Sequence, residues 1–178
     1  LDDEQLLAIK KNGGVVQTVA LGSYLNAKKV KAFRALRDSI FKQVSGEIGI
    51  EIISTRELKK LSVNEISKYK ADYEKIVDAS IKKIEEIKKV APPVSVIDFV
   101  DHIDYLTKVM GIDHVGISSD FDGGGGIEGW SDASETLNVT KELVNRGYSE
   151  KEIKKIWGDN LLRVMGEVEN VSKKLQGK

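Results

Sequence analysis

The stretch that decides the fold runs from Asp113 to Trp130 and reads Asp-His-Val-Gly-Ile-Ser-Ser-Asp-Phe-Asp-Gly-Gly-Gly-Gly-Ile-Glu-Gly-Trp. It opens with the short apolar run Val115–Ile117, whose β-branched residues favour a buried strand over a helical turn. Two acids, Asp120 and Asp122, follow this run and precede four consecutive glycines. Because functional carboxylates of α/β folds lie at the carboxyl ends of parallel strands, this order predicts a site.

The glycine run from Gly123 to Gly126 is longer than a tight turn requires. Glycine adopts positive φ without steric cost and allows a substrate to approach the main chain. The alternative is an Asp-rich turn without chemistry, since Asp and Gly are both common turn residues. We favour a functional loop, because binding and catalytic residues gather on loops that a rigid scaffold holds.

The composition indicates one globular domain and excludes several classes of partner. The chain has 178 residues, and its 28 Lys and Arg balance 28 Asp and Glu, so the formal net charge is zero. Binding to nucleic acid or to an anionic membrane surface needs a basic excess. The sequence has no cysteine, which excludes disulfides and thiolate metal ligands, and no apolar run approaches a membrane span.

Two segments repeat the order helix, glycine, strand. The first has a helix capped by Asp2 or Asp3 and then Val15–Leu21, a strand predicted to be buried on both faces. The second has a helix at Asp98–Met110 and then the strand that starts at Val115. Such repetition is typical of α/β barrels. Two parallel strands cannot close a sheet, so the chain either belongs to a larger barrel or associates to cover its edges.

From about residue 26 to 91 the composition shifts to Lys, Glu, Ile and Ala and predicts a helical insertion. Ala27–Val44 is predicted to be helical, with an interruption at Gly46–Gly49. Ser62 and Glu65 form a capping box at the start of a second long helix. A lid or a dimer arm is the functional alternative, and an amphipathic insertion that packs on a barrel is favoured. One stripe along the second helix comprises Ile66, Tyr69, Tyr73, Ile76, Ser80, Ile84 and Ile87.

Residues 92–178 are predicted to form the last helix and strand unit, the glycine loop and the C-terminal helices. Ala133–Arg146 is expected to be helical, and Ser149 with Glu152 caps a short helix. A last helix is predicted to begin at Asp159 or Asn160. At the other end, Leu1 is followed at once by a predicted helix without an initiator Met, so we expect the middle of a longer protein.

Two further interpretations of Asp120 and Asp122 come from their spacing. A calcium loop of the EF-hand kind requires a carboxylate eleven positions after the first Asp, where Ser131 stands, and is discarded. A Mg²⁺-dependent phosphatase of the haloacid dehalogenase class also places Asp-x-Asp-Gly after a strand, with one Asp as nucleophile and the other as acid. That class has the motif near the chain start and a Thr after it, where this chain has Gly124.

Five segments follow one another in an order that matches one protein family. They are Asp98-Phe99-Val100-Asp101-His102-Ile103, Gly111-Ile112-Asp113-His114-Val115-Gly116-Ile117, Ser119-Asp120-Phe121-Asp122-Gly123, Leu143-Val144-Asn145-Arg146-Gly147-Tyr148-Ser149 and Asn160-Leu161-Leu162-Arg163-Val164. Through these segments residues 94–168 resemble the C-terminal end of the membrane (renal) dipeptidase family, zinc metallopeptidases of the amidohydrolase superfamily, and the glycine run is similar to bacterial members. Residues 2–25 resemble the preceding helix and strand of that family.

The resemblance implies a (β/α)8 TIM-type barrel, of which this helix-rich α/β chain holds the C-terminal portion with about two parallel strands. It implies hydrolysis of dipeptides by a hydroxide that bridges two zinc ions, with a carboxylate handling the proton. On this resemblance Asp120 is the proton-transfer residue, and Tyr24 and Gly123 fall at the substrate pocket. Asp122, at the same pocket, is expected to fix the loop through main-chain N–H groups.

The family's zinc ligands lie on earlier strands, so this segment is expected to hold no metal ligand. Only two histidines are present, His102 in a helix and His114 at the start of a strand, and neither is expected to bind zinc. The isolated segment is therefore predicted to be inactive, and its expected partners are a dipeptide, the N-terminal part of the barrel and a second copy in a homodimer. A non-catalytic, self-associating helical module remains the alternative. The resemblance also suggests a periplasmic or secreted protein.

Overall fold

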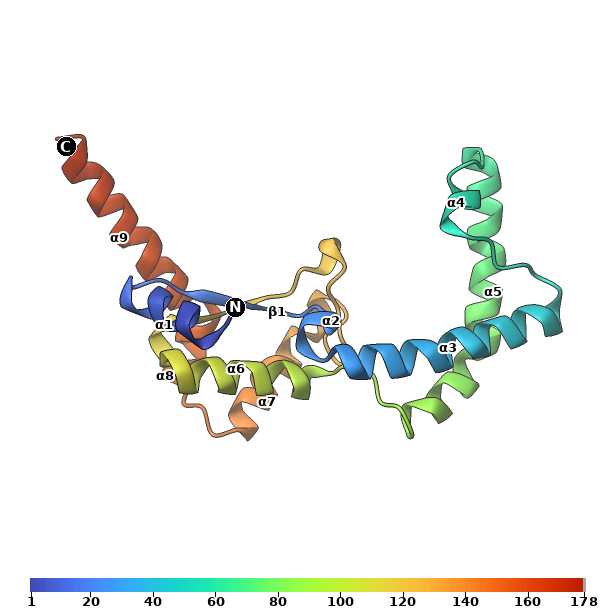
Figure 1. The fold of residues 1–178 in the computed structure, drawn as a ribbon, viewed down its shortest axis with the longest axis horizontal. Coiled ribbons are helices and arrows are strands. Elements are labelled where there is room, and N and C mark those ends of the chain that lie inside the picture. Colours follow the sequence, from blue (N-terminus) through green and yellow to red (C-terminus); the bar gives the residue numbers. More distant parts are fainter. Residues whose placement is uncertain (178) are drawn as a thin grey trace. The chain divides into compact units, whose positions relative to one another are not determined.

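The computed structural model describes residues 1–177, which form two compact units (Figure 1). The α/β unit combines residues 1–27 with the chain from residue 94 onward, and the helical unit comprises residues 28–93. The sequence predicts a helical insertion at 26–91, within two residues of these boundaries. Because the helical unit is inserted into the α/β unit, both of its ends continue into the same sheet-containing unit.

The sheet of the α/β unit has two parallel strands, β1 (Val16–Val19) and β2 (Val115–Ser118). Val16 pairs with Val115, and Val19 pairs with Ser118. Each strand follows a helix, namely α1 (Asp3–Lys11) and α6 (Val96–Met110), which confirms the predicted repeat of helix and strand. Asp2 caps α1 by accepting a hydrogen bond from the Gln5 main-chain N–H.

Helix α6 supplies the main apolar layer against the sheet. It packs on both strands, as the spacing of its apolar residues predicts. Gly111 then ends the helix with a φ of +87°, a conformation that glycine adopts without strain. A single turn of 3-10 helix at Ile112–His114 leads from this glycine into β2. The buried apolar residues of α6 are Val96, Phe99, Val100, Ile103, Leu106 and Met110.

The prediction that Val15–Leu21 is buried on both faces is wrong. Strand β1 covers only Val16–Val19, and Thr18 is its one buried residue. Among residues 1–177 no third strand pairs with β1 or β2, so each strand has one unpaired edge. Solvent therefore reaches side chains that a complete parallel sheet would cover.

The helical unit is built from α3 (Ala27–Ile48), α4 (Thr55–Leu58) and α5 (Val63–Lys88). Its core joins Phe41 and Val44 of α3 to Ile76 of α5. Ser62 and Glu65 form the predicted capping box at the start of α5. The predicted interruption at Gly46–Gly49 is confirmed at Gly49, whose φ is +70°, but α3 continues through Gly46 and ends at Ile48.

The C-terminal part of the chain is a series of helices that belong to the α/β unit. They are a 3-10 turn at Ala133–Glu135, α7 (Thr136–Asn145), α8 (Glu150–Lys154), a π-helical turn (Lys155–Asp159) and α9 (Asn160–Leu175). The predicted helix start at Asp159 or Asn160 is confirmed, because α9 begins at Asn160. Both residues have right-handed helical φ and ψ, so α9 continues from the π turn without a break.

Three side chains tie together the amino ends of the two strands. The buried Asn160 amide donates to the main-chain oxygens of Ile112 at 2.7 Å and Val115 at 2.8 Å. Arg163 donates to the Gly13 and Asp113 carbonyls at 3.0 and 3.1 Å. The His114 Nδ1 atom lies 2.7 Å from the Gly14 carbonyl, to which it donates. These bonds fix both strands at their amino ends. At their carboxyl ends the strands continue into the loops.

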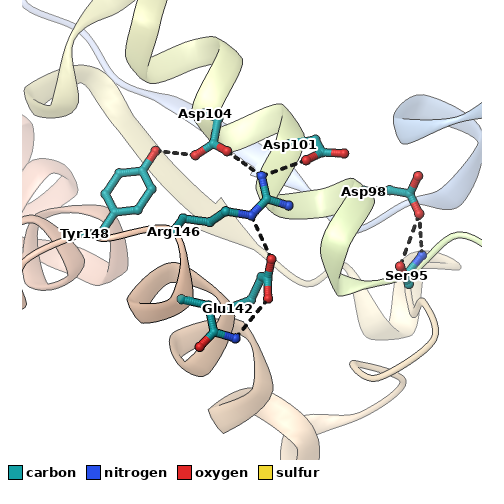
Figure 2. A network of polar contacts seen from close by, with 8 residues as sticks. Ser95, Asp98, Asp101, Asp104, Glu142, Arg146 and Tyr148 are labelled. Carbon is teal, nitrogen blue, oxygen red and sulfur yellow. Dashed lines mark hydrogen bonds and ion pairs between the residues drawn. The ribbon is translucent and has the colours of Figure 1, made fainter.

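An ionic network joins α6 to α7 (Figure 2). The Arg146 guanidinium binds Asp101 at 2.8 Å and Asp104 at 2.7 Å on α6, and Glu142 at 2.8 Å on α7. Its three carboxylate partners raise the pKa of Arg146. The Tyr148 hydroxyl donates to Asp104 at 2.7 Å, and burial together with this carboxylate raises the pKa of Tyr148 to about 12.

Within residues 1–177 no helix is both long and apolar enough to cross a membrane.

Candidate functional site

Asp120 lies two residues beyond β2, at the carboxyl end of the strand, and its side chain is exposed. Its backbone has φ of 55° and ψ of 33°, the left-handed conformation that non-glycine residues rarely adopt. Two main-chain N–H groups hold this turn, because Gly123 and Gly125 donate to the Asp120 carbonyl at 3.0 and 2.7 Å. The left-handed backbone of a polar residue at a strand end is the kind of local strain found at functional sites.

Two glycines of the loop, Gly123 and Gly125, are required by close packing. A Cβ atom on Gly123 would lie 2.2 Å from the Oδ1 atom of Asp120, so the carboxylate lies directly against the Gly123 main chain. A Cβ atom on Gly125 would lie 2.1 Å from the Ser119 carbonyl oxygen. The sequence predicts a glycine-dependent approach at this loop, and the group that approaches is the Asp120 side chain itself.

The glycine loop is bonded to the end of the neighbouring strand. The Gly126 N–H donates to the Ala20 carbonyl at 3.0 Å, and the Ala20 N–H donates to the Ser118 carbonyl at 3.0 Å. Asp120 therefore lies at the edge where both parallel strands end. In a parallel sheet this edge is where ligands bind.

Tyr24 comes shortly after the carboxyl end of the other strand, β1. It lies in α2 (Gly22–Leu25), the short helix after β1, and its side chain is 70% exposed. It lines a groove of about 530 Å³ that runs along β1 and also includes Leu6, His102 and Tyr105. Asp120 is not among the residues that line this groove. The structure thus places Tyr24 beside the unpaired edge of β1, while Asp120 belongs to the loop after β2.

Asp122 behaves differently from the prediction. Its side chain is exposed and makes no hydrogen bond to a main-chain N–H among the described residues. The loop is held instead by the N–H groups of Gly123, Gly125 and Gly126. These N–H groups donate to the main-chain carbonyls of Asp120 and Ala20 and not to the Asp122 carboxylate, because the glycines allow the chain to fold back on Asp120.

An aromatic cluster, which the sequence did not predict, supports the loop. Phe121, the residue after Asp120, meets the Trp130 ring edge-on, with centroids 5.5 Å apart. Trp130 is buried and also contacts Phe99 at 5.2 Å and Trp157 at 6.1 Å. The sequence does show one aromatic residue on each side of the glycine run, Phe121 and Trp130. Whether their rings touch depends on how the loop closes, which the sequence does not indicate.

No group of three or more His, Asp or Glu side chains that could hold a metal ion is found within residues 1–177. His102 is exposed on α6, and His114 donates to a carbonyl at the amino end of β2. The residues of this chain therefore do not fit a binuclear zinc centre by themselves. Asp120 is the acid that the structure places at the carboxyl ends of the strands with its backbone fixed.

Comparisons with known proteins identify the family of this chain. The family model for membrane dipeptidase, peptidase family M19, matches residues 1–178. Dipeptidase aclJ of Aspergillus oryzae is 41% identical over 86 residues, which are 48% of this chain and 20% of that protein. Dipeptidase ataJ of Aspergillus terreus is 50% identical over 74 residues, which are 41% of this chain and 18% of that protein.

A solved structure covers nearly the whole chain. The crystal structure of the probable dipeptidase PvdM from Pseudomonas aeruginosa aligns with a TM-score of 0.59 and 32% identity, over 96% of this chain and 41% of that one. The chain thus spans about a fifth of the curated relatives and less than half of the solved one. None of these matches supports the phosphatase interpretation. The helix-rich α/β chain belongs to the membrane dipeptidase family, peptidase family M19.

Proposed function

We propose that this chain is the C-terminal part of a dipeptidase, in which β1 and β2 are the last two strands of a (β/α)8 barrel. The parallel pairing of β1 and β2 and the unpaired edge of each strand support this proposal. In a closed barrel each of these edges pairs with a further strand. The 41% coverage of the solved dipeptidase is consistent with a partial barrel.

Asp120 is proposed as the proton-transfer residue of peptide hydrolysis, and its position is the observation that carries this role. An exposed carboxylate at the carboxyl end of a barrel strand lies where substrates of such barrels bind. As a general base it takes a proton from the attacking water, and as a general acid it returns that proton to the leaving amine. The left-handed backbone and the contact with Gly123 limit how far the carboxylate moves.

The resemblance to the dipeptidase family implies that zinc takes part in the reaction, and residues 1–177 hold no group of side chains that could bind it. The metal ligands are therefore proposed to come from the N-terminal part of the barrel, together with the remainder of the dipeptide pocket. What this chain contributes is the proton-transfer carboxylate, the loop that fixes it and Tyr24 beside the β1 edge.

Asp120→Asn in the assembled, zinc-containing dipeptidase tests this assignment. The amide keeps the shape of the side chain but cannot accept the proton, so kcat should fall by about 10²–10⁴-fold. Asp159→Asn is the matched control, since Asp159 is an exposed acid of the π turn. Dipeptidase activity that survives Asp120→Asn unchanged would remove Asp120 from the mechanism.

A non-catalytic, self-associating module is the second candidate, and the outer face of α9 favours it. Leu161, Leu162, Met165, Val168 and Val171 are all exposed on this helix. Contiguous apolar surface of this kind is typical of an interface. Light scattering of the purified 178-residue chain distinguishes the cases, because a compact monomer without a partner chain contradicts self-association.

A further inference from the structure

The loop that carries Asp120 is closed by contacts between its two ends. Phe121 directly follows Asp120, and Trp130 ends the loop; their rings meet edge-on at an interplanar angle of 78°. Trp130 also exchanges main-chain hydrogen bonds with Ile127, at 2.9 and 3.1 Å. We propose that Trp130, with its indole held by Thr136, is a positioning residue that fixes Asp120 through Phe121. The catalytic consequence rests on the proposed function, whereas the effect on loop order does not.

The loop needs such support because of its composition. Four consecutive glycines lose more conformational freedom on ordering than any other residues, so the loop tends to open. Asp120 is itself in a left-handed conformation that costs energy for a residue with a side chain. The hydrogen bonds of Gly123 and Gly125 to the Asp120 carbonyl form only when the loop is closed. A contact across the two ends of the loop favours this closed state.

Trp130 is well suited to be the fixed side of this contact. It is 2% exposed, and its ring contacts those of Phe99 and Trp157. The Trp130 Nε1 atom donates to the Thr136 hydroxyl at 3.1 Å, which sets the rotation of the indole. Edge-to-face packing of Phe121 depends on that rotation, because the positive ring edge must meet the negative ring face. Thr136 therefore acts on Asp120 through two aromatic rings.

The chain provides a matched control for Thr136. The Trp157 Nε1 atom donates to the Thr140 hydroxyl at 3.0 Å, so the same kind of indole–threonine bond occurs one helical turn later on α7. Trp157 contacts Trp130 but is not paired with Phe121. Thr136→Val and Thr140→Val each remove one such hydroxyl from a partly buried threonine of the same helix. Only the first is predicted to loosen the loop.

The first measurement is amide hydrogen exchange of Gly123 and Gly125 in the 178-residue chain. Thr136→Val should speed their exchange by about fivefold, the factor expected when the closed loop loses the net stabilisation of one hydrogen bond. Thr140→Val should leave the exchange rate unchanged. Thr136→Ser, which keeps the hydroxyl, should restore the slow exchange. Phe121→Leu removes the ring contact without altering the Thr136 bond and should speed exchange as well. Equal exchange in Thr136→Val and Thr140→Val would overturn the positioning role.

The second measurement is steady-state kinetics of the assembled dipeptidase. Thr136→Val should lower kcat by about tenfold with KM unchanged, because a misplaced catalytic group weakens the transition state rather than substrate binding. Thr140→Val should not lower kcat, and Thr136→Ser should recover it. If the exchange results hold while Asp120→Asn keeps full activity, the positioning stands and the proposed function fails. If Asp120→Asn is inactive but the two valine variants have equal kcat, the positioning role fails.

Discussion

At the scale of single residues, the site depends on how closely the Asp120 carboxylate approaches Gly123. The space that a Cβ atom would take at Gly123 is occupied by the carboxylate. The sequence alone indicates that glycine is needed after the two acids, because a run of four exceeds the needs of a turn. Which group fills the space at Gly123 depends on the rotamer of Asp120 and could not be predicted.

Gly123→Ala should therefore impair Asp120 with little effect on folding. The added methyl group meets the movable end of a side chain, so the carboxylate rotates away and the main chain keeps its path. We expect kcat of the assembled enzyme to fall by about 10–100-fold, as for a displaced catalytic group. Gly166→Ala on α9 is the control, since a methyl group there meets no atom within 4 Å. Equal kcat values for the two variants would contradict the contact.

Tyr148 gives the α6–α7 network a signature at high pH. Its pKa is raised to about 12 from an ordinary value of 10.0, so the folded state holds the phenol proton more tightly than the unfolded state. The resulting stabilisation is complete below pH 10 and is lost as the pH rises through about 12. Titration of tyrosinate absorbance should show a late step that disappears in Tyr148→Phe. A late step that persists in this variant would show that another group titrates there.

At the scale of elements, local signals in the sequence predict much of the structure. The capping boxes before α5 and α8, the glycine that ends α6 and the apolar spacing within α6 all act within a few residues, and each is confirmed. Two features that the sequence did not predict involve partners distant in sequence. Val44 and Glu47, on either side of Gly46 in α3, meet Ile76 and Lys83 of α5, and the π turn before α9 packs on β2. Local propensity is a weak guide where such partners decide.

Two glycines of the helical unit should respond in opposite ways to alanine. Gly46 lies inside α3 with open space around it, so Gly46→Ala should stabilise the helix by about 0.5–1 kcal/mol. Gly49 has a φ of +70°, so Gly49→Ala should destabilise the unit by about 1 kcal/mol. Urea unfolding followed by circular dichroism measures both. Shifts of the same sign would contradict the end of α3 at this point.

Asn160 connects the start of α9 to the amino end of β2. Its buried amide serves two carbonyl oxygens, so Asn160→Leu leaves both without their donor and should cost about 2–3 kcal/mol. Asn170→Leu, at an exposed position of the same helix, should change stability by no more than about 0.5 kcal/mol. Midpoints of urea unfolding compare the two variants. A small effect of Asn160→Leu would mean that water replaces the lost donor.

At the scale of the whole molecule, the two-stranded sheet limits what the chain does alone. The strand count and the parallel arrangement were predicted from the repeated helix–glycine–strand order and are confirmed. The aromatic cluster beneath the loop was missed, because Phe99, Trp130 and Trp157 come from three separate segments. Sequence spacing carries no information on contacts between segments whose relative placement depends on the fold.

The isolated 178-residue chain should not hydrolyse dipeptides. Its described residues hold no cluster of side chains for a metal ion, so added zinc should not produce activity. Adding the N-terminal part of the barrel should restore hydrolysis, and Asp120→Asn should abolish the restored activity. The measurement is dipeptide turnover with and without a chelator. Chelator-sensitive turnover by the purified chain alone would refute this prediction.

The insertion of residues 28–93 between β1 and β2 also has a consequence for biosynthesis. Val19 pairs with Ser118, so β1 leaves the ribosome long before its partner strand exists. At about 5–20 residues per second, the wait lasts on the order of ten seconds. During this time the helical unit can fold from its own residues, because its core cluster around Phe41, Val44 and Ile76 lies entirely within residues 28–93. The nascent β1 strand, with its backbone unpaired, is then the segment that chaperones must shield.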